Sequence, residues 1–180
     1  IKVPLESIHE HTDKKKIDAP KFFRKSEMKL AHQQRQADKK KRGSKNCKKS
    51  FEIVDKTQET IANQRKDFLH KTSRYYSDKY DLVAMEDLNV KGMIRNRHLS
   101  KSIADVSWGM FANMLDYKLK MLGRHLVEVN PRFTTQKCSE CGELVQKSLS
   151  VRTHICNCGY IAYRDHNAAR NILTAGLGQA

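Results

Sequence analysis

The stretch YDLVAMEDLNVKGM, residues 80–93, joins a short apolar run to two carboxylates, Glu86 and Asp87, and then to a basic segment with glycine. The run LVAME is compatible with β structure, and it is bounded by Asp81 and by a Lys91-Gly92 turn. This pattern predicts a central strand of a sheet. Glu86 lies at its carboxyl end, so the stretch predicts a strand with an acidic side chain at its mouth.

The residues before this strand predict short strands and then a long helical hairpin. Residues 1–18 alternate loosely between apolar and polar side chains around the turn-like TDKK, which predicts two or three short strands, the first weakened by Pro4. Residues 23–41 and 47–78 are rich in helix formers, and the break RGSKN separates them. Together these two segments predict the hairpin.

The residues after the strand predict a helix, a strand, an insertion and a last helix. Residues 107–122 repeat apolar side chains at helical spacing, with Ser107 placed as the N-cap and Gly123 as the stop. Residues 125–130 predict another strand, and RDHNAARNILTAG predicts a helix that ends at Gly176. This order predicts an α/β core in which helices cover a sheet.

The charge of the chain favours a polyanionic partner. Lysine and arginine number 35 against 20 aspartate and glutamate residues, so the net charge is +15. Such a balance favours nucleic acid through release of counterions, and a ribosomal-type or merely soluble basic protein is the alternative. No apolar run approaches the ~20 residues of a membrane helix, and no signal peptide opens the chain. We therefore expect a soluble, intracellular protein.

Many of the basic residues fall on the predicted hairpin. They form either a solvated helix face or an arm that grips a nucleic-acid backbone, and both interpretations stay open. The candidates for nucleic-acid binding are Lys39, Lys40, Lys41, Arg42, Lys45, Arg65 and Lys66 on the hairpin and Lys91, Arg95 and Arg97 after the central strand.

Four of the five cysteines crowd into CSECGELVQKSLSVRTHICNCGY, residues 138–160. Without an export signal, this crowding favours a metal site over disulfides. Cys138 and Cys141 form a C-x-x-C knuckle, and Cys156 and Cys158 form a C-x-C knuckle. Four thiolates close a tetrahedral shell around Zn²⁺, so we expect a structural zinc ribbon.

Two points about the cysteines stay open. The C-x-C spacing is tighter than the commoner C-x-x-C, which makes His154 a candidate substitute ligand. A degenerate site that binds metal weakly, or a reduced thiol cluster, is the alternative to the ribbon. The fifth cysteine, Cys47, is expected to be a surface thiol.

Asp165 stands at the entrance of the last predicted helix. An aspartate there is commonly an N-cap or a partner of the helix dipole. Combined with Glu86 at a strand end in a basic α/β chain, it also suits a nuclease whose carboxylates hold two Mg²⁺ ions.

Several segments together resemble one family. MEDLNVKGM, RNRHLSKSIADVSWG, FTTQKCSECG and RDHNAARNIL resemble the TnpB (OrfB) family of transposon-encoded proteins, relatives of the type V CRISPR effectors. The resemblance implies an RNase H-like, RuvC-type nuclease core interrupted by a zinc ribbon, in an RNA-guided DNA endonuclease that acts in transposition. The implied core covers residues 1–137 and 162–176, with the hairpin at about 23–79 inserted, followed by a tail at 177–180. The ribbon covers residues 138–161.

The resemblance also assigns metal-binding positions. In the family, an aspartate on the first strand, a glutamate after the central strand and an aspartate before the last helix hold catalytic metals. Glu86 and Asp165 match the second and third, whereas Lys2 occupies the position of the first. An ammonium group there removes a ligand and repels a cation, so we expect impaired or lost cleavage. Tyr163, where the family usually carries another acid, weakens the site further.

The length of the chain implies that it corresponds to only part of the family's proteins. In the family, a preceding half recognises DNA and grips the guide RNA, so we expect a C-terminal nuclease half, in a prokaryotic cytoplasm at the nucleoid, with DNA and guide RNA as partners. The resemblance implies Zn²⁺ as structural and Mg²⁺ as catalytic metal. The alternatives are a nuclease-dead RNA-guided DNA-binding protein and a zinc-ribbon nucleic-acid-binding module.

Overall fold

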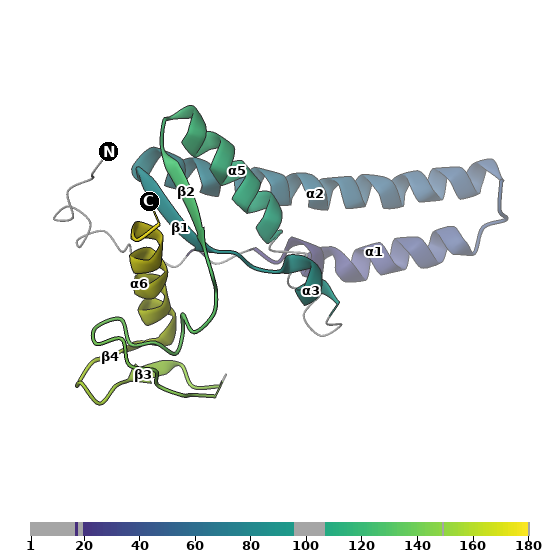
Figure 1. Ribbon diagram of the computed structural model, residues 1–180. Helices are drawn as coiled ribbons and strands as arrows, with labels where there is room; N and C mark the ends of the chain where they lie inside the picture. Colours follow the sequence, from purple (N-terminus) through teal and green to yellow (C-terminus); the bar gives the residue numbers. More distant parts are fainter. Residues whose placement is uncertain (1–16, 18–19, 96–106, 149, 180) are drawn as a thin grey trace. The chain divides into compact units, whose positions relative to one another are not determined.

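The computed structural model describes residues 17, 20–95, 107–148 and 150–179 (Figure 1). The chain divides into two compact units. We call residues 80–88 and 124–179 the sheet unit, and residues 20–79, 89–95 and 107–123 the hairpin unit. The short strands predicted over residues 1–18, and with them Lys2, lie outside the described residues apart from Ile17.

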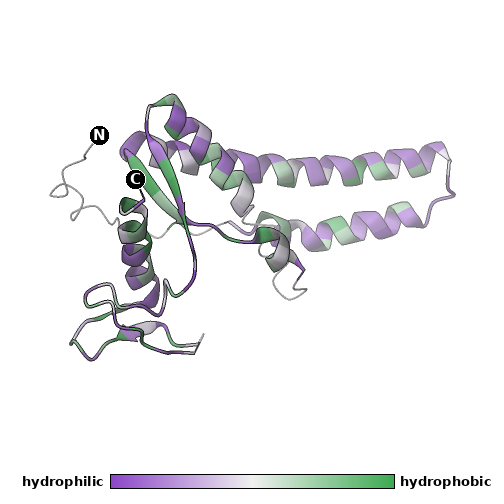
Figure 2. Cartoon of the chain, in the orientation of Figure 1, coloured by the Kyte–Doolittle hydropathy of each residue, from purple (hydrophilic) through white to green (hydrophobic). Residues whose placement is uncertain are grey.

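The described helices of the hairpin unit are α1 (Phe22–Asp38), α2 (Lys45–Lys79), α3 (Val90–Ile94) and α5 (Trp108–Met121). Helices α1 and α2 pack side by side as the predicted hairpin (Figure 1). Leu30, Ala37 and Val54 form its buried core. Most residues of the two helices are hydrophilic (Figure 2), so a narrow apolar stripe holds the helices together.

Cys47 belongs to that stripe, so the prediction of a surface thiol was wrong. Its side chain is only 7% exposed. Cys47, Val54 and Ile61 follow one another at intervals of seven residues on α2, which places them on one face of the helix, and all three are buried. The Cys47 amide donates to the hydroxyl of Ser44 at 3.1 Å, which caps the start of the helix.

Helix α5 packs against α2 through a buried lysine. The ammonium group of Lys118 donates to Ser73 Oγ at 2.6 Å and to the His70 carbonyl at 2.8 Å. Burial lowers the pKa of Lys118, and Arg74 lowers it further. These two hydrogen bonds satisfy a charge that would otherwise be costly to bury.

Two local predictions in this unit differ in detail from the structure. Ser107 occupies the predicted N-cap position of α5, but its backbone is left-handed (φ 50°) and its side chain makes no capping hydrogen bond. The expected Lys91-Gly92 turn is part of the short helix α3, because the Asn89 side chain accepts from the Gly92 amide at 2.9 Å and caps that helix. The predicted stop at Gly123 is confirmed by its φ of +67°.

The sheet unit contains two parallel strands, β1 (Leu82–Glu86) and β2 (His125–Val129), with Glu86 opposite Val129. Helix α6 (Arg164–Leu177) packs on both strands (Figure 1). The contact is close, because a Cβ added to Gly176 would lie 2.6 Å from the Ala84 Cβ. Strand β1 is apolar up to Met85, whereas β2 also carries the exposed side chains His125 and Glu128. Met85 and Val129 are the buried residues of the pair.

A small β-hairpin completes the sheet unit. Strands β3 (Thr153–Ile155) and β4 (Ile161–Tyr163) pair antiparallel, and β4 leads directly into α6.

Among the described helices, none is both long and apolar enough to cross a membrane.

Candidate metal centre and acidic site

The four clustered cysteines meet in space. Cys138 and Cys141 come from the loop after β2, and Cys156 and Cys158 come from the turn between β3 and β4. Their sulfur atoms all lie within 4.8 Å of one another, with Cys138 and Cys158 at 3.8 Å and Cys141 and Cys156 at 3.5 Å. Four sulfurs around one zinc ion, each about 2.3 Å from it, would lie about 3.8 Å apart. The spacing of the four sulfur atoms therefore fits a metal ion with tetrahedral coordination.

Each knuckle turns through a glycine. Gly142 follows the first pair of cysteines with a φ of +80°, and Gly159 follows the second with a φ of +90°. This backbone conformation favours glycine because it lacks a Cβ. The Gly142 amide donates to the Cys138 carbonyl at 3.0 Å, and the Gly159 amide donates to the Cys156 carbonyl at 3.0 Å. The two loops are thus closed around the sulfurs by matching turns.

The thiols differ in acidity. Burial opposes ionisation of Cys138, but the backbone amides of Cys141 and Glu140 and the His154 side chain outweigh it and lower the pKa of Cys138 to about 6. For Cys156 the Cys158 amide favours the thiolate, but burial and the neighbouring sulfurs raise its pKa to about 12. Several thiolates so close together repel one another, and a bound cation relieves that repulsion.

His154 lies beside the sulfurs but outside the group of described residues that could hold a metal ion. The four sulfurs form a complete set without it. Its ring is fully buried, and its Nδ1 lies against the ammonium group of Lys147. An ammonium group only donates, so Nδ1 accepts and the proton of a neutral ring sits on Nε2. Nε2 is buried without a conventional hydrogen-bond partner among the described residues, and the ring helps to lower the pKa of Cys138.

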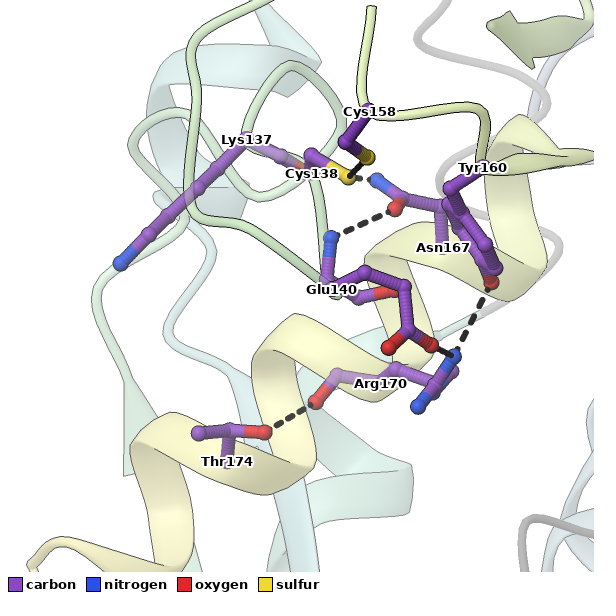
Figure 3. A network of polar contacts seen from close by, with 9 residues as sticks. Lys137, Cys138, Glu140, Cys158, Tyr160, Asn167, Arg170 and Thr174 are labelled. Atoms are coloured by element: carbon purple, nitrogen blue, oxygen red, sulfur yellow. Dashed lines mark hydrogen bonds and ion pairs between the residues drawn. The ribbon is translucent and has the colours of Figure 1, made fainter. Parts of the chain in front are cut away.

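Helix α6 braces the cysteine loop through two asparagines, Asn167, which Figure 3 shows, and Asn171. The Asn167 side chain is fully buried; it donates to the Lys137 carbonyl at 2.7 Å and accepts from the Ser139 amide at 2.9 Å. Asn171 donates to the same Lys137 carbonyl at 2.6 Å and to the Thr134 carbonyl at 2.8 Å. The backbone on both sides of Cys138 is therefore fixed to the helix.

A charged contact adds to this brace. The Arg170 guanidinium donates to Glu140 and to the Tyr160 hydroxyl, the latter at 3.2 Å, so one side chain of α6 touches both cysteine-bearing loops (Figure 3). The prediction from sequence missed this brace. Its signal is the run NAARN, which places Asn167, Arg170 and Asn171 on one side of the helix.

Glu86 is oriented by a neighbouring threonine. The Thr134 hydroxyl donates to Glu86 Oε1 at 2.6 Å and Thr134 is 8% exposed. Because Asn171 holds the Thr134 carbonyl at 2.8 Å, Glu86 is linked to α6 through a single residue. Glu86 thus lies at the carboxyl end of β1 with one carboxylate oxygen held in place.

Asp165 lies in the first turn of α6, after the N-cap position held by Tyr163. Its side chain is 77% exposed and pairs with Arg164 at 3.4 Å. The described residues do not bring Glu86 and Asp165 into one group of three metal-ligating atoms, and Lys2 lies outside them. The described structure thus contains one oriented carboxylate, Glu86, and one exposed carboxylate, Asp165.

The basic candidates lie in three parts of the chain. Five of them, Lys39, Lys40, Lys41, Arg42 and Lys45, are exposed around the link between α1 and α2. Along α2, Lys66 is exposed and Arg65 is half-buried. Arg95 is exposed just after α3, Lys91 belongs to α3, and Arg97 lies outside the described residues.

Two family models match this chain. Residues 5–97 match OrfB_IS605, described as "Probable transposase". Residues 108–172 match the "Cas12f1-like, TNB domain". The second match includes the four cysteines and Asp165, and the first includes Glu86.

Relatives of the chain carry corresponding descriptions. A "Putative RNA-guided DNA endonuclease" of Streptomyces pristinaespiralis is 40% identical over 90% of this chain and 41% of the relative. InsQ of Escherichia coli strain K12, with the same description, is 34% identical over 86% of this chain and 42% of the relative. The chain thus spans well under half the length of these curated relatives.

One solved structure has a similar fold. It is the cryo-EM structure of a Cas12f1–sgRNA–target DNA complex, with a TM-score of 0.56 and 21% identity. The match covers 83% of this chain and 41% of that chain.

Proposed function

Because the chain belongs to the OrfB_IS605 family of transposase-like proteins, we propose that it forms the nuclease-bearing part of a TnpB-like RNA-guided DNA endonuclease. The parallel pair β1–β2 covered by α6 is consistent with an RNase H-like, RuvC-type core. In this proposal the core covers residues 1–137 and 162–176, with the hairpin inserted, and residues 138–161 form the ribbon.

We assign a structural zinc ion to Cys138, Cys141, Cys156 and Cys158. The sulfur spacing supports tetrahedral coordination, and four thiolates leave no open position for a substrate. The ion therefore stabilises the loops around it and takes no part in the reaction. His154 supports this site without binding the ion, because it stabilises the Cys138 thiolate.

We assign Glu86 and Asp165 as carboxylates of the catalytic site. A divalent metal such as Mg²⁺, when bound, supplies positive charge to the phosphate oxygens during strand cleavage. Glu86 offers an oxygen ligand whose orientation Thr134 fixes at 2.6 Å. Asp165 offers an exposed carboxylate at the start of α6. The resemblance assigns Lys2 to the position of the family's first metal-binding aspartate, and a positive charge at that position would oppose cation binding, so we expect impaired cleavage.

The observation that carries the proposal is the link from Glu86 through Thr134 to Asn171. It fixes the acid at the end of β1 to the helix that carries Asp165 in its first turn and braces the cysteine loop. A carboxylate oriented in this way is pre-organised to hold a cation. An acid at a strand end with only a structural role does not require such an orienting hydrogen bond.

Plasmid nicking tests the assignment. We expect slow nicking of supercoiled DNA by the chain in Mg²⁺ or Mn²⁺, with or without guide RNA. The substitution Lys2→Asp should raise the rate by at least ~100-fold, because it restores a ligand and removes a repulsive charge. Adding Glu86→Gln to that variant should abolish the gain. The matched control is Glu128→Gln, an exposed acid on β2, which should leave the rate unchanged.

Vigorous cutting by the unmodified chain that survives Glu86→Gln would contradict the assignment of the site. Equal, slow rates for the unmodified chain and Lys2→Asp would instead favour a second function, RNA-guided DNA binding without cleavage. Lys2 itself motivates this second candidate.

In both candidates, the exposed basic residues at the α1–α2 link bind the nucleic-acid backbone. Neutralising Lys39, Lys40, Lys41 and Arg42 should then weaken binding of DNA and RNA and reduce its salt dependence, because fewer counterions are released. An unchanged salt dependence would show that these residues form only a solvated helix face and do not bind nucleic acid.

A further inference from the structure

Phe133 stands out in the loop that follows β2. Its backbone has a φ of +65°, a conformation that side chains with a Cβ rarely adopt. Its ring is 43% exposed although it is aromatic and apolar. Strained backbone that holds an apolar side chain in solvent is commonly found at functional sites.

Hydrogen bonds on both sides hold this conformation. The Gln136 and Lys137 amides both donate to the Phe133 carbonyl at 2.9 Å. On the other side, the Arg132 amide donates to Asn130 Oδ1 at 2.9 Å. The next residue, Thr134, is buried and bonded to Glu86. The backbone conformation at Phe133 is therefore held by the surrounding loop.

A positive charge accompanies the ring. The Arg132 guanidinium carbon lies 4.7 Å from the centre of the Phe133 ring, within the range of a cation–π contact. Both side chains are exposed. An exposed ring next to an exposed guanidinium is the combination that stacks a nucleobase and attracts its phosphate.

We propose that Phe133 and Arg132 form a nucleobase platform, on which a base of a single strand stacks while Arg132 contacts a neighbouring phosphate. This inference rests on the proposed function, since the platform adjoins the residue that orients Glu86. In a duplex the base faces are already stacked, so the ligand is a single-stranded polynucleotide, DNA or RNA, whose shared chemistry is a base face and a phosphate.

The test is binding of fluorescently labelled single-stranded DNA and single-stranded RNA to the full chain, measured by anisotropy. Phe133→Leu should weaken binding by about 5- to 150-fold, the range expected for loss of one stacked base. Phe133→Trp should retain binding, because the indole also stacks. The DNA and RNA arms show which strand uses the platform.

The salt dependence of binding distinguishes the role of Arg132 from that of Phe133. Arg132→Gln should lower the salt slope of binding by about one, since one phosphate contact is lost. Phe133→Leu should leave that slope unchanged while lowering affinity. The matched control is Phe51→Leu, because Phe51 is exposed to a similar degree, 40%, but lies on α2; it should bind like the unmodified chain.

Loss of fold cannot be mistaken for loss of the platform. Phe133→Gly accepts the positive φ without strain, so it should keep its zinc content and circular dichroism spectrum while binding as weakly as Phe133→Leu. Wild-type affinity in Phe133→Leu and Phe133→Gly would overturn the platform and leave the proposed function standing. Failure of the unmodified chain to bind any polynucleotide would overturn both.

Discussion

At the scale of single residues, His154 is a buried side chain beside the cysteine cluster. It is fully buried, its Nδ1 lies against the ammonium group of Lys147, and it helps to lower the pKa of Cys138. The sequence suggested His154 as a ligand because the C-x-C spacing is tight. In the structure, the group that could hold a metal contains the four sulfurs and not His154, whose Nδ1 lies against Lys147. The spacing of the cysteines alone does not contain this contact.

We predict that His154→Ala weakens zinc binding by ~10- to 100-fold, the usual effect of removing a group that supports a ligand. The Cys138 thiolate would lose the imidazole that lowers its pKa. Competition with a chromophoric chelator measures the affinity. His154→Gln retains a donor and should recover part of the loss, whereas the exposed His125 provides a control as His125→Ala. Affinity in His154→Ala within twofold of wild type would contradict this role.

At the scale of secondary structure, patterns within one element predicted well and contacts between elements did not. The predicted helices at 23–41, 47–78 and 107–122 appear as α1, α2 and α5, because long amphipathic repeats and breaks are local signals. The burial of Cys47 and the role of Asn171 depend on a partner elsewhere in the chain. Sequence therefore supplied Glu86 and the cysteines, but not Thr134, which orients Glu86 from 48 residues away.

The contact of α6 with β1 leads to a second prediction. Gly176→Ala should destabilise the chain by ~1–3 kcal/mol, because the new methyl group would lie 2.6 Å from the Ala84 Cβ and the helix must move. Gly178 is a control on the same segment: an added Cβ there meets only ordinary contacts at 3.7 Å, so Gly178→Ala should be tolerated. Denaturant unfolding measures both. Equal stability of the two variants would show that α6 packs differently on β1.

Combining Gly176→Ala with Ala84→Gly should recover part of the lost stability, because the second change removes the methyl group that the first one meets. An additive loss in the double variant would show that the two positions are not in contact.

At the scale of the whole molecule, the hairpin unit and the cysteine loops of the sheet unit are each stabilised internally in a different way. The hairpin unit contains long helices with an apolar stripe, whereas the cysteine loops have short strands and few buried apolar side chains. Sequence predicted this contrast, since charge-rich helices and crowded cysteines differ in composition. It could not describe the acidic site fully, because such a site needs residues from distant segments to converge.

We predict that a strong chelator unfolds the cysteine loops and leaves α1 and α2 helical. A loop segment of this size has too small a core to persist without metal. Far-UV circular dichroism should retain most of its helical signal, while limited proteolysis should begin to cut within residues 138–163. Re-addition of Zn²⁺ should restore protection. Cooperative loss of all helix on chelation would contradict this independence.

The double hydrogen bond of Asn171 has a consequence for how this loop can vary. One amide group holds the carbonyls of both Thr134 and Lys137, so the three peptide steps between them have a fixed length. An inserted or deleted residue would release either the threonine that aligns Glu86 or the backbone that precedes Cys138. Variation here is therefore confined to the side chains, and the two ends of the loop cannot drift apart.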